Sequence, residues 1–164
     1  MIKNLIFLLP FSFFLSSCSK TPTNSVGCTY TESTVTAPAT EVTALLGLIS
    51  VNHPSAVLHP SGFYYEIISV GTGGTAKLCS SIVVKYTGTL LYPSPGFKFD
   101  ENLTGTTFVL GSLIIAWQKG IPLINSGGII NLYIPPTLGY GATGSGAVPA
   151  NAYLAFSIQL SNVL

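Results

Sequence analysis

Residues 152–160 read AYLAFSIQL, and apolar side chains occupy every second position of this stretch. The alternation places Leu154, Phe156, Ile158 and Leu160 on one side and Ala155, Ser157 and Gln159 on the other. Because side chains of a β-strand point alternately to its two faces, this period of two predicts a strand with one face in a hydrophobic core. The stretch therefore indicates a β-sheet that is buried on one side.

Four earlier stretches carry a similar β signal, because they are rich in β-branched or aromatic residues and lie between turn residues. They are residues 63–68, 81–87, 106–110 and 129–134. Between the last two, residues 113–119 (LIIAWQK) form the one stretch of this part that favours a helix. We expect an α+β domain over residues 62–164, with a sheet of about five strands around one short helix.

A second helix is expected ahead of the sheet, in residues 37–61. Pro38 suits a first helical position and Glu41 suits the first turn. Apolar residues then repeat at helical spacing, at Val42, Leu45, Leu46 and Ile49. His53-Pro54 ends the pattern, so we predict a short amphipathic helix that packs on the main domain.

Composition limits the classes of function. The 164 residues suit one domain with short appendages, and six Lys against five Asp and Glu give a formal net charge of +1. Such a balance lacks the basic surface that nucleic-acid binding requires, so no nucleic-acid partner is expected. The sequence does not indicate the oligomeric state.

The N-terminus resembles the export signal of a bacterial lipoprotein. Lys3 precedes an apolar run over residues 5–15, which is too short for a membrane-spanning helix but suits a signal peptide. Residues 15–18 (LSSC) resemble the lipobox, whose cysteine is lipidated, so we expect a signal peptide at 1–17, lipidation of Cys18 and a tether at 18–36. The alternative is an ordinary signal peptide with an incidental Cys18. On the first interpretation the protein is exported and lipid-anchored to a bacterial membrane, on the periplasmic or the cell-surface side.

Two cysteines remain besides Cys18, namely Cys28 and Cys79. In an oxidising compartment such a pair usually forms a disulfide, which would stabilise the fold by about 4 kcal/mol on a chain-entropy model. Two free thiols are the alternative. Neither cysteine has a metal ligand at a suitable spacing, so no metal site is expected.

Conventional catalytic groups are nearly absent from the sequence. The only histidines, His53 and His59, lie beside prolines in a loop, where we expect them to be solvated. The chain has no nucleophile elbow, no carboxylate pair at useful spacing and no phosphate-binding loop. An enzyme built from this sequence must work without proton transfer, a covalent intermediate or a cofactor.

Aromatic and glycine motifs recur beside the expected turns. In chain order they are Val84-x-Tyr86-Thr87-Gly88, Phe99-Asp100, Phe108-x-Leu110-Gly111, Trp117-x-x-Gly120, Ile134-Pro135, Tyr140-Gly141, Val148-Pro149 and Phe156. Their order and spacing over residues 80–162 resemble the FKBP-type prolyl isomerases. The resemblance implies a curved antiparallel sheet wrapped around a short helix. Ala116, where the family usually has Gly, and a short loop over residues 141–149 depart from the pattern.

The resemblance also implies roles for individual residues. The expected catalytic residues are Tyr86, Phe99, Asp100, Trp117, Tyr140 and Phe156, with Trp117 as the floor of an apolar pocket and Asp100 at its edge. The expected substrate-binding residues are Leu113, Ile114, Ala147 and Val148. The Ile114 N–H and the Tyr140 hydroxyl would donate to carbonyls of the peptide, and Ala147 and Val148 would lie on an overhanging flap. Phe108 is expected in the core.

The function implied is cis/trans isomerisation of X-Pro bonds in exported proteins, with proline-containing peptides and unfolded chains as partners. An apolar pocket favours the twisted, less polar amide over the planar form, and well-placed donors add to that preference. One alternative is a non-catalytic FKBP-like binding module on the membrane surface. Another is a structural β-domain whose aromatic residues are all core, which predicts no hollow around Trp117.

Overall fold

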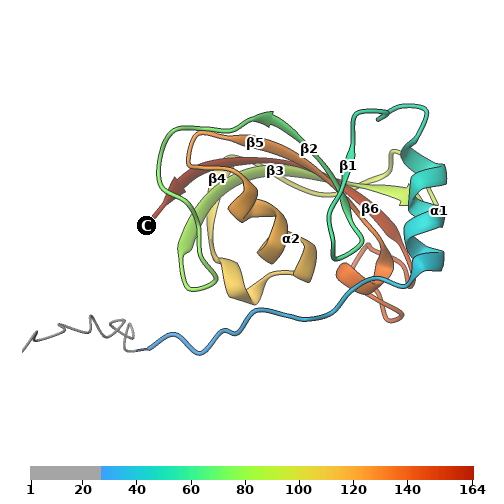
Figure 1. The fold of residues 1–164 in the computed structure, drawn as a ribbon, viewed down its shortest axis with the longest axis horizontal. Coiled ribbons are helices and arrows are strands. Elements are labelled where there is room, and N and C mark those ends of the chain that lie inside the picture. The colour runs from blue at the N-terminus through green and yellow to red at the C-terminus, as the bar shows by residue number, and fades with distance from the viewer. Residues whose placement is uncertain (1–26) are drawn as a thin grey trace, which may run out of the picture.

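The computed structural model describes residues 27–164, in which a curved antiparallel sheet wraps around one short helix (Figure 1). The strand order is β1-β2-β5-β6-β3-β4, and every neighbouring pair is antiparallel. The strands are β1 (Val57–Leu58), β2 (Tyr64–Ser69), β3 (Ser81–Tyr92), β4 (Lys98–Val109), β5 (Ile129–Ile134) and β6 (Tyr153–Val163). This confirms the α+β architecture, and the expected strand over 129–134 has the predicted bounds.

Helix α2 (Ile115–Gly120) lies inside the curve of the sheet (Figure 1). The alternation along β6 sends Leu154, Phe156, Ile158 and Leu160 to this inner side, where all are buried. Gly120 ends the helix against β5, and a Cβ there would lie 2.7 Å from a Leu132 methyl group. A residue without a side chain is therefore needed for the helix to approach the sheet this closely.

Strand β3 continues beyond the predicted residues 81–87 to Tyr92, and two further strands differ more from the prediction. Strand β1, of only two residues, adds a sixth strand at one edge. Strand β4 was expected over 106–110 but begins at Lys98, because residues 98–105 (KFDENLTG) are too polar to show a β pattern. Their pairing with β3, in which Asp100 lies opposite Gly88 and Asn102 opposite Tyr86, extends the strand despite weak local preference.

Helix α1 (Ala39–Ile49) packs on the outer face of the sheet. Leu45 and Ile49 are buried against Tyr64 and Tyr133, which point away from the inner core. Leu46 was predicted to share this face but is 45% exposed. The buried stripe is narrower than the sequence pattern suggested because the helix contacts only one end of the sheet (Figure 1). Pro38 lies just before the helix rather than at its first position.

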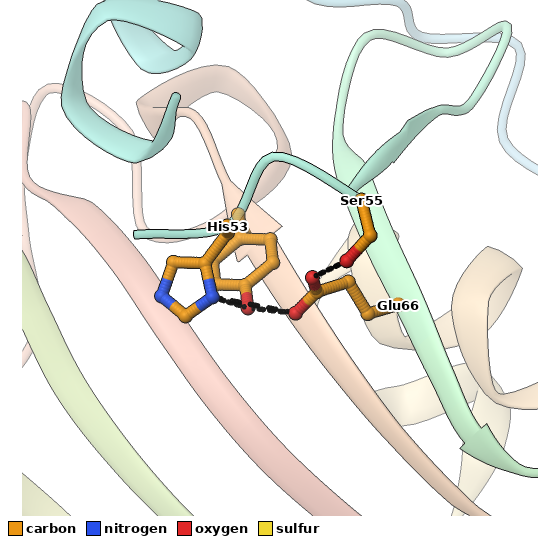
Figure 2. Close-up of polar contacts among 4 residues, drawn as sticks. His53, Ser55 and Glu66 are labelled. Carbon is orange, nitrogen blue, oxygen red and sulfur yellow. Dashed lines mark hydrogen bonds and ion pairs between the residues drawn. The ribbon is translucent and has the colours of Figure 1, made fainter. Parts of the chain in front are cut away.

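The loop after α1 is fastened to the sheet by a polar network (Figure 2). The Tyr133 hydroxyl lies 2.5 Å from Glu66 Oε2 and 2.6 Å from His53 Nδ1, and the Ser55 hydroxyl donates to Glu66 Oε1 over 2.6 Å. Burial tends to raise the pKa of Glu66, but the bonds from Ser55 and Tyr133 outweigh it and hold this pKa below its usual range. Glu66 is thus an ionised acceptor for two hydroxyl donors.

The prediction of two solvated histidines holds only in part, because both are partly buried and make specific contacts. His53 joins the network of Figure 2 and packs on the Tyr133 ring at a centroid distance of 4.4 Å. His59 stacks on Phe63 at 4.3 Å, and its Nδ1 accepts a hydrogen bond from the Ser61 N–H. Burial, and then the charge of Lys119, lower the pKa of His59. Both histidines pack on aromatic rings. The neighbouring prolines in the sequence give no sign of these contacts.

Residues 27–38 form no helix or strand and run beneath α2 toward α1 (Figure 1). Cys28 is joined to Cys79, with 5.7 Å between their Cα atoms. Further along, Tyr30 lies on Gly111 and Glu32 pairs with Lys119 at 3.3 Å. The expected signal peptide and Cys18 lie outside the described residues. Within 27–164, no helix is long and apolar enough to cross a membrane.

Candidate active site

A cavity of about 260 Å³ opens between α2 and the inner face of the sheet. Its walls come from β3, β4, β6, α2 and the loops that flank α2 and β5, so residues distant in sequence converge there. The lining residues are Tyr86, Asp100, Phe108, Ser112, Leu113, Ile114, Trp117, Tyr140 and Phe156. Seven of the ten residues expected to bind or act on a peptide are among them. The interpretation in which all the aromatic residues are core predicted no hollow here and is wrong.

Aromatic rings in edge-to-face contact form the inner part of the cavity. The Trp117 ring lies 5.3 Å from Tyr86 and 5.1 Å from Phe156, at interplanar angles of 82° and 86°. Phe99 packs in the same manner on Phe156, at 5.4 Å and 87°. Such T-shaped pairs are favourable and fix the orientation of each ring. The inner surface of the cavity is therefore apolar and formed by rings that pack directly on one another.

Gly88 makes this ring packing possible. A Cβ at position 88 would lie 2.7 Å from both the Phe156 ring and the Phe99 ring. Any side chain would push the two rings apart. The glycine of the Tyr86-Thr87-Gly88 motif is therefore a steric requirement of the pocket.

One carboxylate governs the electrostatics of the cavity. The Tyr86 hydroxyl donates to Asp100 Oδ2 over 2.6 Å. Burial, followed by this bond and the carboxylate charge, raises the pKa of Tyr86. Burial and then the Asp100 charge also raise the pKa of Tyr140. Both phenols therefore keep their protons at and well above neutral pH.

Two hydrogen-bond donors at the cavity remain available for a ligand. Among residues 27–164, neither the Tyr140 hydroxyl nor the Ile114 N–H donates to a protein acceptor. The Trp117 Nε1–H also lacks an acceptor there, but this atom is buried. Ile114 stands immediately before the first turn of α2, in extended conformation at φ −60° and ψ 150°. The cavity thus combines apolar walls with two free donors, which suits a peptide segment that has carbonyl groups to satisfy.

The structure adds residues that sequence reasoning missed. Phe108 was expected in the core but is only partly buried and lines the cavity, because β4 ends one residue later and the chain turns into a 3₁₀ turn. Ser112 also lines it. The Gln118 amide donates to the Leu113 carbonyl over 2.6 Å and to the Gly111 carbonyl over 3.2 Å, which holds the loop ahead of Ile114. The motif that contains Phe108 was assigned to the core, and no quoted motif names Ser112 or Gln118.

Three expected site residues lie away from the cavity lining. Phe99 stands behind Phe156 and supports it. Val148 is 5% exposed and belongs to the core, while Ala147 is exposed. A tight turn, in which Ser145 and Val148 exchange two backbone hydrogen bonds of 2.9 Å, directs Val148 inward.

In the described part of the chain, no three His, Cys, Asp or Glu residues gather as a metal site would require.

The comparison with known families agrees with the expectation tested by the cavity. Residues 73–161 match the model of the "FKBP-type peptidyl-prolyl cis-trans isomerase" family. The chain belongs to the FKBP family. All nine residues that line the cavity lie within the matched segment, whereas α1 lies outside it.

Individual FKBP proteins extend this likeness. The chain is 37% identical to FkpA of Aeromonas hydrophila over 103 residues, covering 61% of this chain and 37% of the relative. It is 36% identical to FkpA of Escherichia coli K12 over 106 residues, covering 63% and 38% of the two chains. The chain thus spans well under half the length of these relatives.

Solved structures of similar proteins share the fold. The crystal structure of FkpA from Escherichia coli superposes with a TM-score of 0.67 and 30% identity, covering 76% of this chain and 58% of that one. A peptidyl-prolyl cis-trans isomerase from Pseudomonas syringae gives a TM-score of 0.65 at 26% identity, covering 77% and 96%. The likeness therefore extends beyond short motifs to the whole domain.

Proposed function

We propose that this chain is a peptidyl-prolyl cis/trans isomerase that binds the twisted X-Pro amide in the cavity around Trp117. The observation that carries the proposal is the combination of a packed aromatic floor with two free donors, the Tyr140 hydroxyl and the Ile114 N–H. Membership of the FKBP family supports the same chemistry. No group of the cavity needs to exchange a proton or form a covalent bond.

The physical basis is differential binding. Rotation about an X-Pro bond has a barrier of about 18–20 kcal/mol because amide conjugation is lost. The twisted amide is less polar than the planar form, so it loses less by leaving water for the apolar space between Trp117, Tyr86 and Phe156. Donors placed for the twisted geometry bind it better than the planar ground state, and each 1.4 kcal/mol or so of such preference gives a tenfold acceleration.

The test is the rate of cis/trans exchange in a short Leu-Pro or Phe-Pro peptide, measured by NMR with and without the purified chain. We expect acceleration by the wild type and a fall of about 3- to 10-fold in kcat/KM for Tyr140→Phe, the effect of one lost hydrogen bond. Tyr65→Phe is the matched control, because Tyr65 lies on β2 and away from the cavity lining. A folded wild type that leaves the exchange rate unchanged would exclude isomerase activity.

A non-catalytic module that holds apolar or proline-containing segments is the second candidate. The inward position of Val148 and the exposed Ala147 favour it, because the short loop over residues 141–149 then offers little cover for a substrate. Quenching of Trp117 fluorescence by a proline peptide, without any change in its exchange rate, would identify this candidate.

We further propose that the protein is exported and lipid-anchored through Cys18, with exported proteins as its clients. The apolar run over 5–15 and the lipobox-like LSSC at 15–18 support this location. The pairing of Cys28 with Cys79 suits an oxidising compartment. Metabolic labelling with a fatty-acid analogue in a bacterial host should mark the wild type and not Cys18→Ser. Equal labelling of both proteins would contradict the anchor.

A further inference from the structure

Helix α1 contacts the loop that carries the cavity donor Tyr140, although the helix lies outside the family-matched segment. Glu41, in the first turn of α1, accepts two hydrogen bonds from Thr137, which is 96 residues away in sequence. The Thr137 N–H lies 3.0 Å from one carboxylate oxygen, and the Thr137 hydroxyl lies 2.7 Å from the other. Both carboxylate oxygens of Glu41 thus accept hydrogen bonds from the same residue, Thr137.

Thr137 lies in the backbone segment that leads to Tyr140. It is the middle residue of a 3₁₀ turn, Pro136–Leu138, which follows β5. Pro135 and Pro136 have no N–H, so Thr137 supplies the first backbone donor of the turn, and no side chain caps the turn from its preceding residue. The Glu41 carboxylate therefore does from a distance what a local N-cap residue ordinarily does.

The same turn holds Tyr140 on both sides. The Pro136 carbonyl accepts from the Gly139 N–H at 3.0 Å and from the Gly141 N–H at 2.9 Å. Tyr140 lies between these two anchored glycines. A shift of the turn therefore moves the backbone of Tyr140, and with it the hydroxyl at the cavity.

Glu41 is presented by a helix that is itself firmly placed. Leu45 and Ile49 are 0% and 1% exposed in the cluster with Tyr64 and Tyr133. The network of His53, Ser55, Glu66 and Tyr133 fastens the loop after the helix (Figure 2). Ahead of the helix, the Ala37 N–H donates to the Ser61 carbonyl over 2.8 Å. Because α1 is fixed at both ends, the position of its carboxylate is set by the sheet.

We propose that Glu41 is a positioning residue for Tyr140, so that the N-terminal helix α1 tunes the donor of the cavity through Thr137. This inference rests on the proposed isomerase function. A misplacement of about 1 Å at a reacting geometry can cost as much as about 100-fold in rate. For loss of a brace that acts through one turn, we expect a fall in kcat/KM of about 3- to 10-fold, carried mainly by kcat rather than KM.

The test is a double-mutant cycle on the full chain, read as NMR exchange of a Leu-Pro peptide. Glu41→Ala should reduce kcat/KM about 3- to 10-fold when Tyr140 is present and by less than about 1.5-fold in the Tyr140→Phe background. Thr137→Val, which removes one of the two bonds, should give an intermediate loss, and Thr137→Ser, which keeps both donors, should retain wild-type rates. Equal losses with and without the Tyr140→Phe substitution would show that Glu41 does not act through the hydroxyl.

A control separates positioning from general docking of the helix. Ser55→Ala removes one hydrogen bond of the network that holds the loop after α1, while Leu45 and Ile49 still hold the helix itself on the sheet. It should therefore leave kcat/KM within about 1.5-fold of wild type. Amide hydrogen exchange at Thr137 and Gly141 should accelerate in Glu41→Ala but not in Ser55→Ala. An active wild type with an unchanged Glu41→Ala variant would overturn this inference alone, whereas an inactive wild type would overturn the proposed function itself.

Discussion

Two tyrosine–carboxylate pairs lie on opposite faces of the same sheet, and they differ in what remains unsatisfied. On the inner face Tyr86 donates to Asp100 over 2.6 Å at the rim of an open cavity. On the outer face Tyr133 donates to Glu66 over 2.5 Å, and His53 and Ser55 complete the network (Figure 2). Burial and the neighbouring carboxylate raise the pKa of both phenols.

The outer pair is closed, because Tyr133 is 2% exposed and Glu66 has a donor on each oxygen. The inner pair is open, because Asp100 is exposed and has acceptor capacity left for a ligand. The same chemistry thus fastens a helix on one face and lines the candidate site on the other. Exposure of the carboxylate, rather than the pairing itself, separates the two roles.

The largest expected effect is loss of activity in Asp100→Ala. Without the carboxylate, Tyr86 loses its partner and its orientation beside Trp117, so we expect kcat/KM to fall by about 10- to 100-fold, the effect of a hydrogen bond to a charged group. Peptide exchange measured by NMR reports the rate. Asp100→Asn, which keeps an acceptor, should lose less. If both variants equal the wild type, the inner pair has no part in function.

The outer pair should show the reverse pattern in Tyr133→Phe. Removal of the hydroxyl leaves Glu66 and His53 without their shared partner, which should lower the free energy of unfolding by about 1–3 kcal/mol. Urea denaturation followed by circular dichroism measures this change. Activity at a temperature where the variant is folded should stay within about 2-fold of wild type. A large loss of kcat/KM in a folded Tyr133→Phe protein would contradict the view that the outer pair stabilises the fold and the inner pair serves the cavity.

A smaller effect is expected on the acid side of the pH range. Because the pKa of Glu66 is lowered in the folded protein, the unfolded chain binds more protons as the pH falls past the ordinary value of 4.5. The stability from Glu66 is thus present above that value and is lost as the pH falls through the folded pKa. Urea midpoints at about pH 6 and about pH 3.5 should therefore differ less in Glu66→Gln than in the wild type. Glu101→Gln, on the exposed part of β4, is the control.

The sequence predicted the architecture well because the decisive signals are local. The alternation in residues 152–160 identifies β6 and its buried face, and the isolated apolar stretch at 113–119 identifies α2. Strand β4 was underpredicted because the polar residues 98–105 are held in the sheet by β3, and such pairing over a distance leaves no local pattern. The prediction that Leu46 is buried failed for a related reason, since only the tertiary contact decides which part of an apolar helix face is covered.

The candidate site was predictable in its chemistry but not in its outline. The order of the motifs correctly predicted that seven of the ten expected residues line one cavity. It did not predict the backbone turn at Ser145–Val148, which directs Val148 into the core. Phe108 was misplaced because a residue near a strand end changes surroundings when the chain turns. Contacts such as that of Glu41 with Thr137, or of His53 with Tyr133, join residues 96 and 80 positions apart, and one sequence carries no sign of them.

The strand order also leaves one long edge of the sheet without a partner strand. Of the described strands, β4 forms this edge, and an extended segment of another chain would find unpaired backbone groups along it. That edge is interrupted, because the ladder with β3 shifts register between Val84 and Tyr86 and again between Gly88 and Thr89. The paired charges of Lys98 and Glu101 lie near its start. The register shifts and the charged pair therefore discourage another chain from extending the sheet along this edge.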